Sequence, residues 1–176
     1  MPRPAKHLHD WREPVPLRPA ATILLLRDSD RGLEVLMTRR SRSASFAPGA
    51  YVFPGGALDA SDGSALARKV SRQRDDQHDE ILGFATAAAR EAFEELGILL
   101  ACDPGGEPVP AALASQLNRS HDGDLIAQLD ARGWQLSLDH VWWFSHWIAD
   151  RDLPRRFDAR FFIARMPEGQ IPVADN

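Results

Sequence analysis

The stretch from Asp79 to Leu96 constrains the fold most, because its apolar residues recur at helical spacing and leave three carboxylates on the opposite face. Glu91, Glu94 and Glu95 stand at i, i+3 and i+4, which places them on one ridge of a helix. Like charges on one ridge repel one another, and Arg90 supplies a single positive charge among them. Because carboxylate oxygens suit hard cations, this pattern predicts Mg²⁺ or Mn²⁺ rather than zinc, and it indicates phosphate chemistry.

A glycine-rich segment lies upstream of this helix. On its own, the spacing of the glutamates is more often that of a solvated acidic face. Here, however, an apolar strand from Tyr51 runs to Phe53 and then into Pro54-Gly55-Gly56, which we read as a turn. Glycine lets the backbone approach a ligand closely and expose its carbonyl or amide groups. The glycine turn and the acidic helix together predict one site.

These two segments resemble the signature of the Nudix hydrolases, in which Gly, five residues and Glu precede Arg-Glu-(apolar)-x-Glu-Glu-x-Gly-(apolar). The second half matches throughout, at Arg90, Glu91, Glu94, Glu95, Gly97 and Ile98, with the small Ala92 at the first apolar position. The first half departs from the pattern, because the count from Gly56 reaches Asp62 where the signature has glutamate. Arg90 then follows about twenty residues late, as after a surface insertion, whose cost in loop-closure entropy is small.

The interrupted signature is similar to a coenzyme A diphosphatase subgroup of that family, which includes a peroxisomal enzyme of animals. The segments 143–148 and 154–162 also resemble that subgroup. The resemblance implies an α/β (α+β) fold, the Nudix αβα sandwich around a mixed β-sheet. Relatives continue beyond Asn176 with a strand and a helix, a region from which some members draw a catalytic glutamate. We therefore expect either a fragment that lacks this strand and helix, or an open sheet edge that pairs in a homodimer.

The resemblance further implies metal-assisted hydrolysis of a nucleoside diphosphate linked to another moiety, with coenzyme A or acyl-coenzyme A as the expected substrate. Glu94 and Glu95 would ligate Mg²⁺ or Mn²⁺, and the carbonyl of Gly56 would add an oxygen ligand. Glu91 would share a metal or orient water, while Arg90 would hold the glutamates in place. The general base would be Glu91 or Glu95, unless hydroxide forms on the metal.

Two other functions stay open for this sequence. One is a Nudix-fold regulator that binds nucleotides without turnover, as the altered first half of the signature allows. The other is a structural or interaction domain whose acidic helix is merely exposed to solvent. The presence of Glu91, Glu94 and Glu95 together favours the enzyme, because a binding protein has no mechanistic need for all three.

Candidate substrate-binding residues lie on both sides of the signature. Arg39 and Arg40 belong to a polar loop, and Arg156 lies in a cluster with Arg155 and Arg160 around Asp158. A guanidinium matches phosphate oxygens well, although solvated charge or internal pairing explains such clusters equally. Phe53 is expected in the same site. Of the tryptophans at 142, 143 and 147, we expect two in the core and one able to stack on adenine.

The chain divides into a proline-rich, extended leader over residues 1–18 and one domain over residues 19–176. Insertions are expected at about 60–79 and, with helices, at about 104–135. The alternation of apolar residues predicts strands over 20–27, 33–38 and 160–165, with a core strand within 136–148. Helices are expected over 64–70, 79–96, 110–117 and 124–132, and Gly97 should end the second of them.

Composition excludes several classes of protein. A net charge of −4 without a basic tail argues against nucleic acid as a partner. The apolar run from Ala20 to Leu26 is too short to span a membrane or to act as a signal peptide. The single cysteine, Cys102, excludes an internal disulfide, so a reducing, cytoplasmic location is expected. His140 and His146 have no neighbouring ligand pattern and are expected to be ordinary polar residues.

Overall fold

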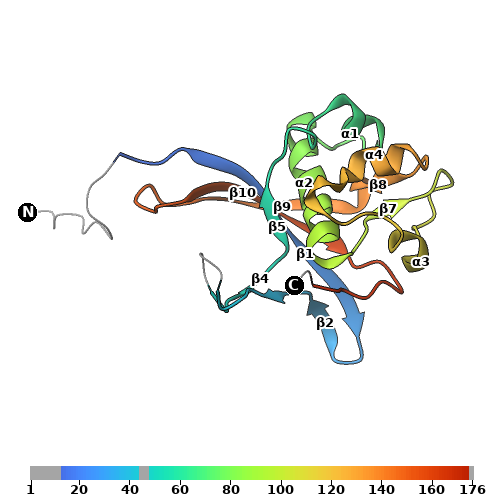
Figure 1. The fold of residues 1–176 in the computed structure, drawn as a ribbon, viewed down its shortest axis with the longest axis horizontal. Helices are drawn as coiled ribbons and strands as arrows, with labels where there is room; N and C mark the ends of the chain where they lie inside the picture. Colours follow the sequence, from blue (N-terminus) through green and yellow to red (C-terminus); the bar gives the residue numbers. More distant parts are fainter. Residues whose placement is uncertain (1–12, 44–47, 175–176) are drawn as a thin grey trace, which may run out of the picture.

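Strand β1 (Leu17–Ser29) is the centre of the main sheet in the computed structural model, which describes residues 13–43 and 48–174 (Figure 1). On one side β1 pairs in parallel with β10 (Arg156–Arg165), which in turn pairs antiparallel with β9 (Val141–Ile148). On its other side β1 pairs antiparallel with β5 (Gly55–Ala57) and, further along, with β2 (Gly32–Val35). The predicted hairpin between the first two strands and the predicted strand at 160–165 are therefore confirmed.

Helix α2 (Asp79–Leu96) packs on one face of this sheet. Alternate residues of β1, namely Ala21, Ile23 and Leu25, are buried there, as the two-residue period of a strand requires. The facing stripe of α2 is rich in alanine, so the helix lies close to the sheet. The buried residues of that stripe include Leu82, Ala85, Ala88, Ala89, Ala92, Phe93 and Leu96. The predicted α+β fold is thus confirmed.

Gly97 ends α2 as the sequence predicts. Its backbone is left-handed, with φ of 69°, and its amide donates to the carbonyl of Phe93 at 2.7 Å. The next amide, that of Ile98, donates to Ala92 at 3.3 Å, so two carbonyls of the last turn are satisfied. Glycine adopts this conformation without the steric strain that a Cβ brings. The position of Gly97 therefore fixes where the acidic ridge stops.

Smaller elements complete the fold. Figure 1 shows α1 (Ala65–Lys69) and α4 (Leu125–Asp130) on the same side of the main sheet as α2. Both short helices were predicted, and Ser64 caps the first by accepting a hydrogen bond from the amide of Ala67. The others are β3 (Thr38–Arg39), β4 (Tyr51–Val52), β6 (Ser71–Arg72), β7 (Ala101–Cys102), α3 (Ala111–Ala114), η1 (His121–Gly123), β8 (Gln135–Ser137) and η2 (Leu138–His140).

The glycine segment is a strand where the sequence predicted a turn. Gly55 and Gly56 belong to β5, which pairs with residues 20–22 of β1. A Cβ at Gly55 would lie 2.4 Å from the carbonyl oxygen of Ala21, closer than a side chain tolerates. Glycine is therefore required here for two backbones to approach each other, and the approach continues a sheet. The prediction failed because glycine is ordinarily a turn signal.

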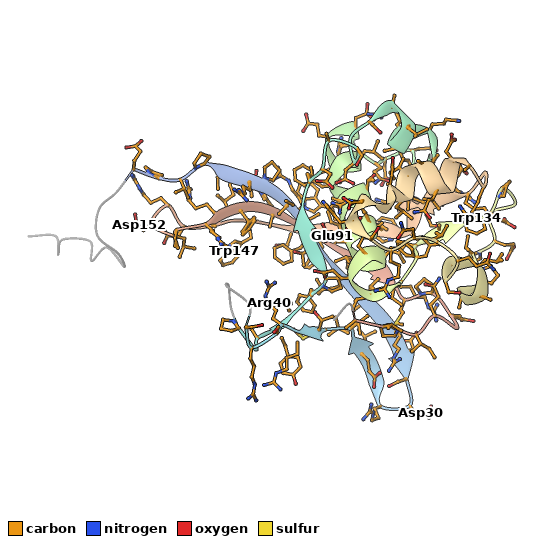
Figure 2. All side chains as sticks on the ribbon, in the orientation of Figure 1. Asp30, Arg40, Glu91, Trp134, Trp147 and Asp152 are labelled. Atoms are coloured by element: carbon orange, nitrogen blue, oxygen red, sulfur yellow. The ribbon has the colours of Figure 1, made fainter. Side chains whose placement is uncertain are left out.

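The prediction that two of three tryptophans pack in the core is wrong. Trp142, Trp143 and Trp147 are exposed by 50%, 46% and 68%. They lie on β9, the edge strand of the main sheet, and Figures 1 and 2 show β9 and β10 projecting beyond the helices, with Trp147 on the projecting part. The guanidinium of Arg74 stacks on Trp142 at 3.7 Å from the ring centre. Apolar composition predicted burial, but no local signal marks β9 as an edge.

Several expectations concern the limits of the domain. β1 begins at Leu17, two residues before the expected start at Pro19, because Leu17 already pairs with Arg156. Residues 1–12 of the expected leader lie outside the described residues. Cys102 is buried. The described residues contain no helix long and apolar enough to cross a membrane. The homodimer stays a prediction.

A buried glutamine, Gln170, joins the segment after β10 to Leu99. Its replacement tests how much this contact stabilises the fold. Gln170 is 6% exposed; its Oε1 accepts from the amide of Leu99 at 2.7 Å, and its Nε2 donates to the carbonyl of Leu99 at 3.1 Å. Gln170→Ala leaves both groups of Leu99 buried without these partners. We expect the free energy of unfolding in urea to fall by about 2 kcal/mol. The exposed Gln116→Ala is the control, and an equal effect of both substitutions would contradict this reading.

Candidate functional site

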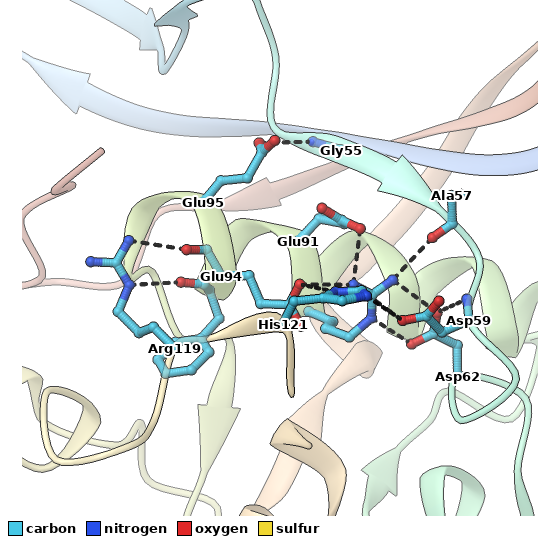
Figure 3. Close-up of polar contacts among 11 residues, drawn as sticks. Gly55, Ala57, Asp59, Asp62, Glu91, Glu94, Glu95, Arg119 and His121 are labelled. Atoms are coloured by element: carbon cyan, nitrogen blue, oxygen red, sulfur yellow. Dashed lines mark hydrogen bonds and ion pairs between the residues drawn. The ribbon is translucent and has the colours of Figure 1, made fainter. Parts of the chain in front are cut away.

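Arg90 is the hub of the candidate site, and Figure 3 labels the residues that accept hydrogen bonds from it, Ala57, Asp62, Glu91 and Glu94. Its side chain is only 4% exposed, and its Nε and Nη2 donate to the two carboxylate oxygens of Asp62 at 2.9 and 3.1 Å. Nη2 also donates to the carbonyl of Ala57 at 3.0 Å, while Nη1 donates to Glu91 and Glu94 at 2.9 and 3.0 Å. Burial opposes the charge, but these carboxylates outweigh it and hold the pKa of Arg90 above its usual value. Arg90 thus contacts Glu91 and Glu94 but not Glu95, and its role in holding the glutamates stays a prediction.

Asp62 is the partner that balances this buried charge. It is completely buried, and besides Arg90 it accepts a hydrogen bond from the amide of Asp59 at 2.8 Å. We did not assign Asp62 to the site from sequence, although the count from Gly56 reaches it. An aspartate where the signature has glutamate was a signal that could have found it. Asp62 thus ties the beginning of the first insertion to the acidic helix.

Each of the three glutamates uses one carboxylate oxygen to fix its position. Arg90 holds Oε1 of Glu91 and Oε2 of Glu94, and the amide of Gly55 donates to Oε2 of Glu95 at 3.3 Å. The second oxygen of each carboxylate has no hydrogen bond to the residues that the structure describes. The ridge therefore offers three oxygens of the kind that Mg²⁺ and Mn²⁺ bind.

β5 forms the wall opposite this ridge. A Cβ at Gly56 would lie 2.3 Å from Oε1 of Glu91, so glycine is needed where the strand passes the carboxylate. Burial raises the pKa of Glu91 to about 7, against the lowering effect of Arg90. Burial also raises the pKa of Glu95, and the hydrogen bond from Gly55 opposes it. A cation would lower both values, so the chemistry of the donors fits a divalent metal.

The carboxylate oxygens that would bind a metal ion do not yet converge on one point. Within residues 13–43 and 48–174, no group of three or more His, Cys, Asp or Glu side chains is arranged to hold a metal ion. Arg90 sits among the carboxylates and keeps two of them turned toward itself. Binding of a cation would therefore require the free oxygens of the glutamates to converge. The carbonyl of Gly56 as a ligand stays a prediction.

A cavity of about 460 Å³ opens above the glutamates, a size that suits a small-molecule ligand. Its walls come from four parts of the chain: the acidic helix, the β3–β4 region, the second insertion and the segment after β10. The lining residues are Thr38, Arg39, Arg40, Ser41, Val52, Glu91, Glu94, Glu95, Arg119, His121 and Ala174. Negative charge thus lies on the helix, and the cationic side chains come from the β3–β4 region and the second insertion.

The structure brings two of the four predicted substrate-binding residues to this cavity. Arg39 donates to the carbonyl of Gly49 at 3.2 Å, whereas the Arg40 guanidinium has no hydrogen bond to the described residues and lowers the pKa of Glu95 by its charge. Phe53 is half-buried and is not among the lining residues. Arg40 is therefore the better placed of the two arginines to meet an anionic ligand.

Arg156 is not brought to the cavity. Its Nε donates to the carbonyls of Ala149 and Asp150 at 3.3 and 3.1 Å, and its Nη1 donates to that of Val15 at 3.2 Å. Arg156 thus closes the projecting end of the sheet. Its neighbour Arg160 pairs with Asp158 and lowers the pKa of that carboxylate. Internal pairing, the alternative considered from sequence, describes both arginines.

Arg119 and His121 are the cavity residues that sequence reasoning missed. Arg119 donates to the carbonyls of Phe93 and Glu94 at 3.2 and 3.1 Å, where α2 ends and a positive charge is favourable. His121 Nδ1 lies 3.4 Å from Oε2 of Glu94, and this contact raises the pKa of His121. Both residues lie in the insertion, about which the signature carries no information.

Comparison with known proteins agrees with this geometry. The family model described as the NUDIX domain matches residues 16–108. The human acyl-coenzyme A diphosphatase NUDT19 is 32% identical over 78% of the chain and 49% of its own length. The putative nudix hydrolase 7 of Caenorhabditis elegans is 29% identical over 83% of the chain and 43% of its own length. The chain therefore spans about half the length of these curated relatives.

A solved structure resembles the whole domain. The crystal structure of a Nudix hydrolase from Alicyclobacillus acidocaldarius has a TM-score of 0.74 and 31% identity, and covers 92% of this chain and 75% of that one. The similarity thus extends beyond residue 108 into the second insertion and the last strands.

The buried pair of Asp62 and Arg90 generates a stability prediction. Asp62→Ala leaves the Arg90 charge buried without its main partner, a change that costs about 3–5 kcal/mol. We expect the urea midpoint to fall accordingly, whereas Asp130→Ala, which removes the exposed partner of Lys69, should have a far smaller effect. Equal losses in the two variants would show that the pair does not organise the site.

Glu91 generates a prediction about pH in chelated, metal-free protein. Its pKa of about 7 in the folded state exceeds the value of 4.5 for a free side chain, so the folded state binds the proton more tightly. This contribution to stability is complete below pH 4.5 and is lost as the pH rises to about 7.

The comparison to make is between wild type and Glu91→Gln, in which this titration is absent. The two proteins should have similar unfolding free energies near pH 4, where the side chain is mostly protonated in both states. The variant should be the more stable by about 3 kcal/mol near pH 8. A difference that does not vary with pH would contradict the raised pKa.

Proposed function

The chain belongs to the Nudix family, and from this premise we propose that it hydrolyses the diphosphate bond of a nucleoside diphosphate linked to another moiety. The reaction would depend on Mg²⁺ or Mn²⁺. The observation that carries the proposal is the arrangement around Arg90, which donates to Glu91 and Glu94 beneath a cavity that cationic side chains of the β3–β4 region and the second insertion also line. The substrate's phosphates would lie between the glutamates and these side chains.

In this mechanism Glu94 and Glu95 would hold the cation through their free oxygens, with the carbonyl of Gly56 as a further ligand. The cation, when bound, neutralises the diphosphate and lowers the pKa of water. Arg40 binds a phosphate oxygen, because its guanidinium has no other hydrogen bond among the described residues. These residues bring the phosphorus atom and the attacking water together.

Glu91 is the residue we assign to the attacking water. Its second oxygen has no hydrogen bond among the described residues and is available to accept a proton from water. The water oxygen forms a bond to phosphorus, its proton passes to Glu91, and the bond to the bridging oxygen breaks. The second phosphate leaves with that oxygen. Glu95 remains the alternative base, since its second oxygen has no hydrogen bond among the described residues either.

The substrate we propose is coenzyme A or an acyl-coenzyme A. The human relative is named an acyl-coenzyme A diphosphatase, and it shares 32% identity with this chain. The arginines and histidine that line the cavity suit a ligand that carries several phosphates. A cytoplasmic location and the lack of nucleic acid partners stay predictions from composition.

The test is hydrolysis by the purified chain of coenzyme A, acyl-coenzyme A, NADH, ADP-ribose and nucleotide sugars, with Mg²⁺, Mn²⁺ or EDTA. We expect turnover of at least one compound, none with EDTA, and a loss of about 100-fold or more in kcat for Glu95→Gln. Glu80→Gln, an exposed position on the same helix, is the matched control.

Each other outcome has a defined meaning. Turnover that survives Glu95→Gln would reject the catalytic assignment. Tight, metal-dependent binding of a nucleotide without turnover would identify a regulator instead of an enzyme. Hydrolysis of ADP-ribose or NADH, with coenzyme A untouched, would overturn the proposed substrate and keep the reaction class.

A further inference from the structure

The loop that carries His121 is held beside the acidic helix. Gln128 accepts from the amide of Asn118 at 2.8 Å and donates to the carbonyls of Asn118 and Gly123 at 3.0 and 2.6 Å. On the other side Arg119 donates to Glu94 of α2 at 3.1 Å and to Val173 at 2.8 Å. These hydrogen bonds join both ends of the loop to neighbouring segments, and the loop places His121 at the cavity.

His121 contacts the middle glutamate of the ridge. Its Nδ1 lies 3.4 Å from Oε2 of Glu94, and its Nε2 lies 3.9 Å from the carboxylate of Asp59. Because a carboxylate only accepts hydrogen bonds, Nδ1 is the donor in the first contact. Arg90 Nη1 donates to the same oxygen at 3.0 Å. Two donors from different parts of the chain thus converge on Oε2.

The contacts with Arg90 and His121 orient the carboxylate of Glu94. With Oε2 held by Arg90 and His121, Oε1 is the oxygen left for a cation. Arg90 Nη1 gives one of its two hydrogens to Glu91 and the other to Glu94, so His121 supplies the second donor on Oε2. A second donor on an oxygen of a metal-binding carboxylate is the kind of support that sets metal affinity.

The side chain of His121 contributes little to packing. It is 70% exposed, and it faces the cavity rather than the core. Exposed side chains of this kind change the free energy of unfolding only slightly when they are replaced. A structural role and a positioning role are therefore separable by experiment.

We propose that His121 is a positioning residue, which holds Oε2 of Glu94 so that Oε1 faces the metal. This inference rests on the proposed function, because it gives Glu94 the role of a metal ligand. It extends the site beyond the Nudix signature, to a residue of the second insertion that no part of the signature predicts.

The test measures the affinity of the whole chain for Mn²⁺ by titration, with electron paramagnetic resonance as the readout. Four variants are compared with wild type. His121→Ala should weaken Mn²⁺ binding by about 10-fold, with an unchanged melting temperature. His121→Asn should restore most of the affinity, because its amide nitrogen takes the place of Nδ1. His121→Gln should restore less, because its amide nitrogen takes the place of Nε2. His140→Ala, an 81% exposed histidine outside the cavity, should bind like wild type.

The outcomes separate this inference from the proposed function. Wild-type affinity in His121→Ala would overturn the positioning role. Equal weakening in the alanine, asparagine and glutamine variants, together with a lower melting temperature, would assign His121 a structural role and also overturn it. Wild-type protein that binds Mn²⁺ but hydrolyses no anhydride would overturn the function alone. Wild-type protein that binds no Mn²⁺ would overturn both.

Discussion

The pairing of Arg90 with Asp62 is the interaction on which the rest of the site depends. A guanidinium with 4% exposure is stable only if its donors are satisfied, and Asp62, Ala57, Glu91 and Glu94 accept from it. A buried ion pair adds little net stability, but it fixes geometry. Here it joins the end of β5, the first insertion and α2 at one point. The insertion thus interrupts the Nudix signature in sequence without separating its halves in space.

The sequence predicted those parts of the molecule that depend on local pattern. The period of the apolar residues and the position of Gly97 located α2, and the spacing of the glutamates placed them on one ridge. Parts that depend on distant contacts were missed or misassigned. Arg156 resembled a phosphate ligand, yet it bonds to carbonyls at the end of the sheet. Two of the tryptophans at 142, 143 and 147 were expected in the core, yet all three are exposed on an edge strand. None of these side chains carries a local sign of its neighbours.

The cavity combines two sources of charge with different origins in the chain. The signature supplies the carboxylates, and the β3–β4 region and the second insertion supply the cationic groups that face them. Loops that surround a conserved core tolerate changes of sequence better than the core does. Substrate preference would then depend mainly on Arg40 and Arg119, while the chemistry would remain with the helix and with His121, which contacts it. This division is consistent with a large family that shares one signature.

The parallel pairing of β1 with β10 has a consequence for how the molecule forms. Leu17 lies beside Arg156, so the central strands of the sheet meet only after almost all the intervening chain is available. Contacts between residues so distant in sequence slow folding, because the entropy of closing the loop is lost before the contact forms. During synthesis on a ribosome, β1, β5 and α2 emerge first and can already pack against one another, whereas the edge of β1 that pairs with β10 stays open until β10 emerges. That open edge offers backbone donors and acceptors to other chains in the interval.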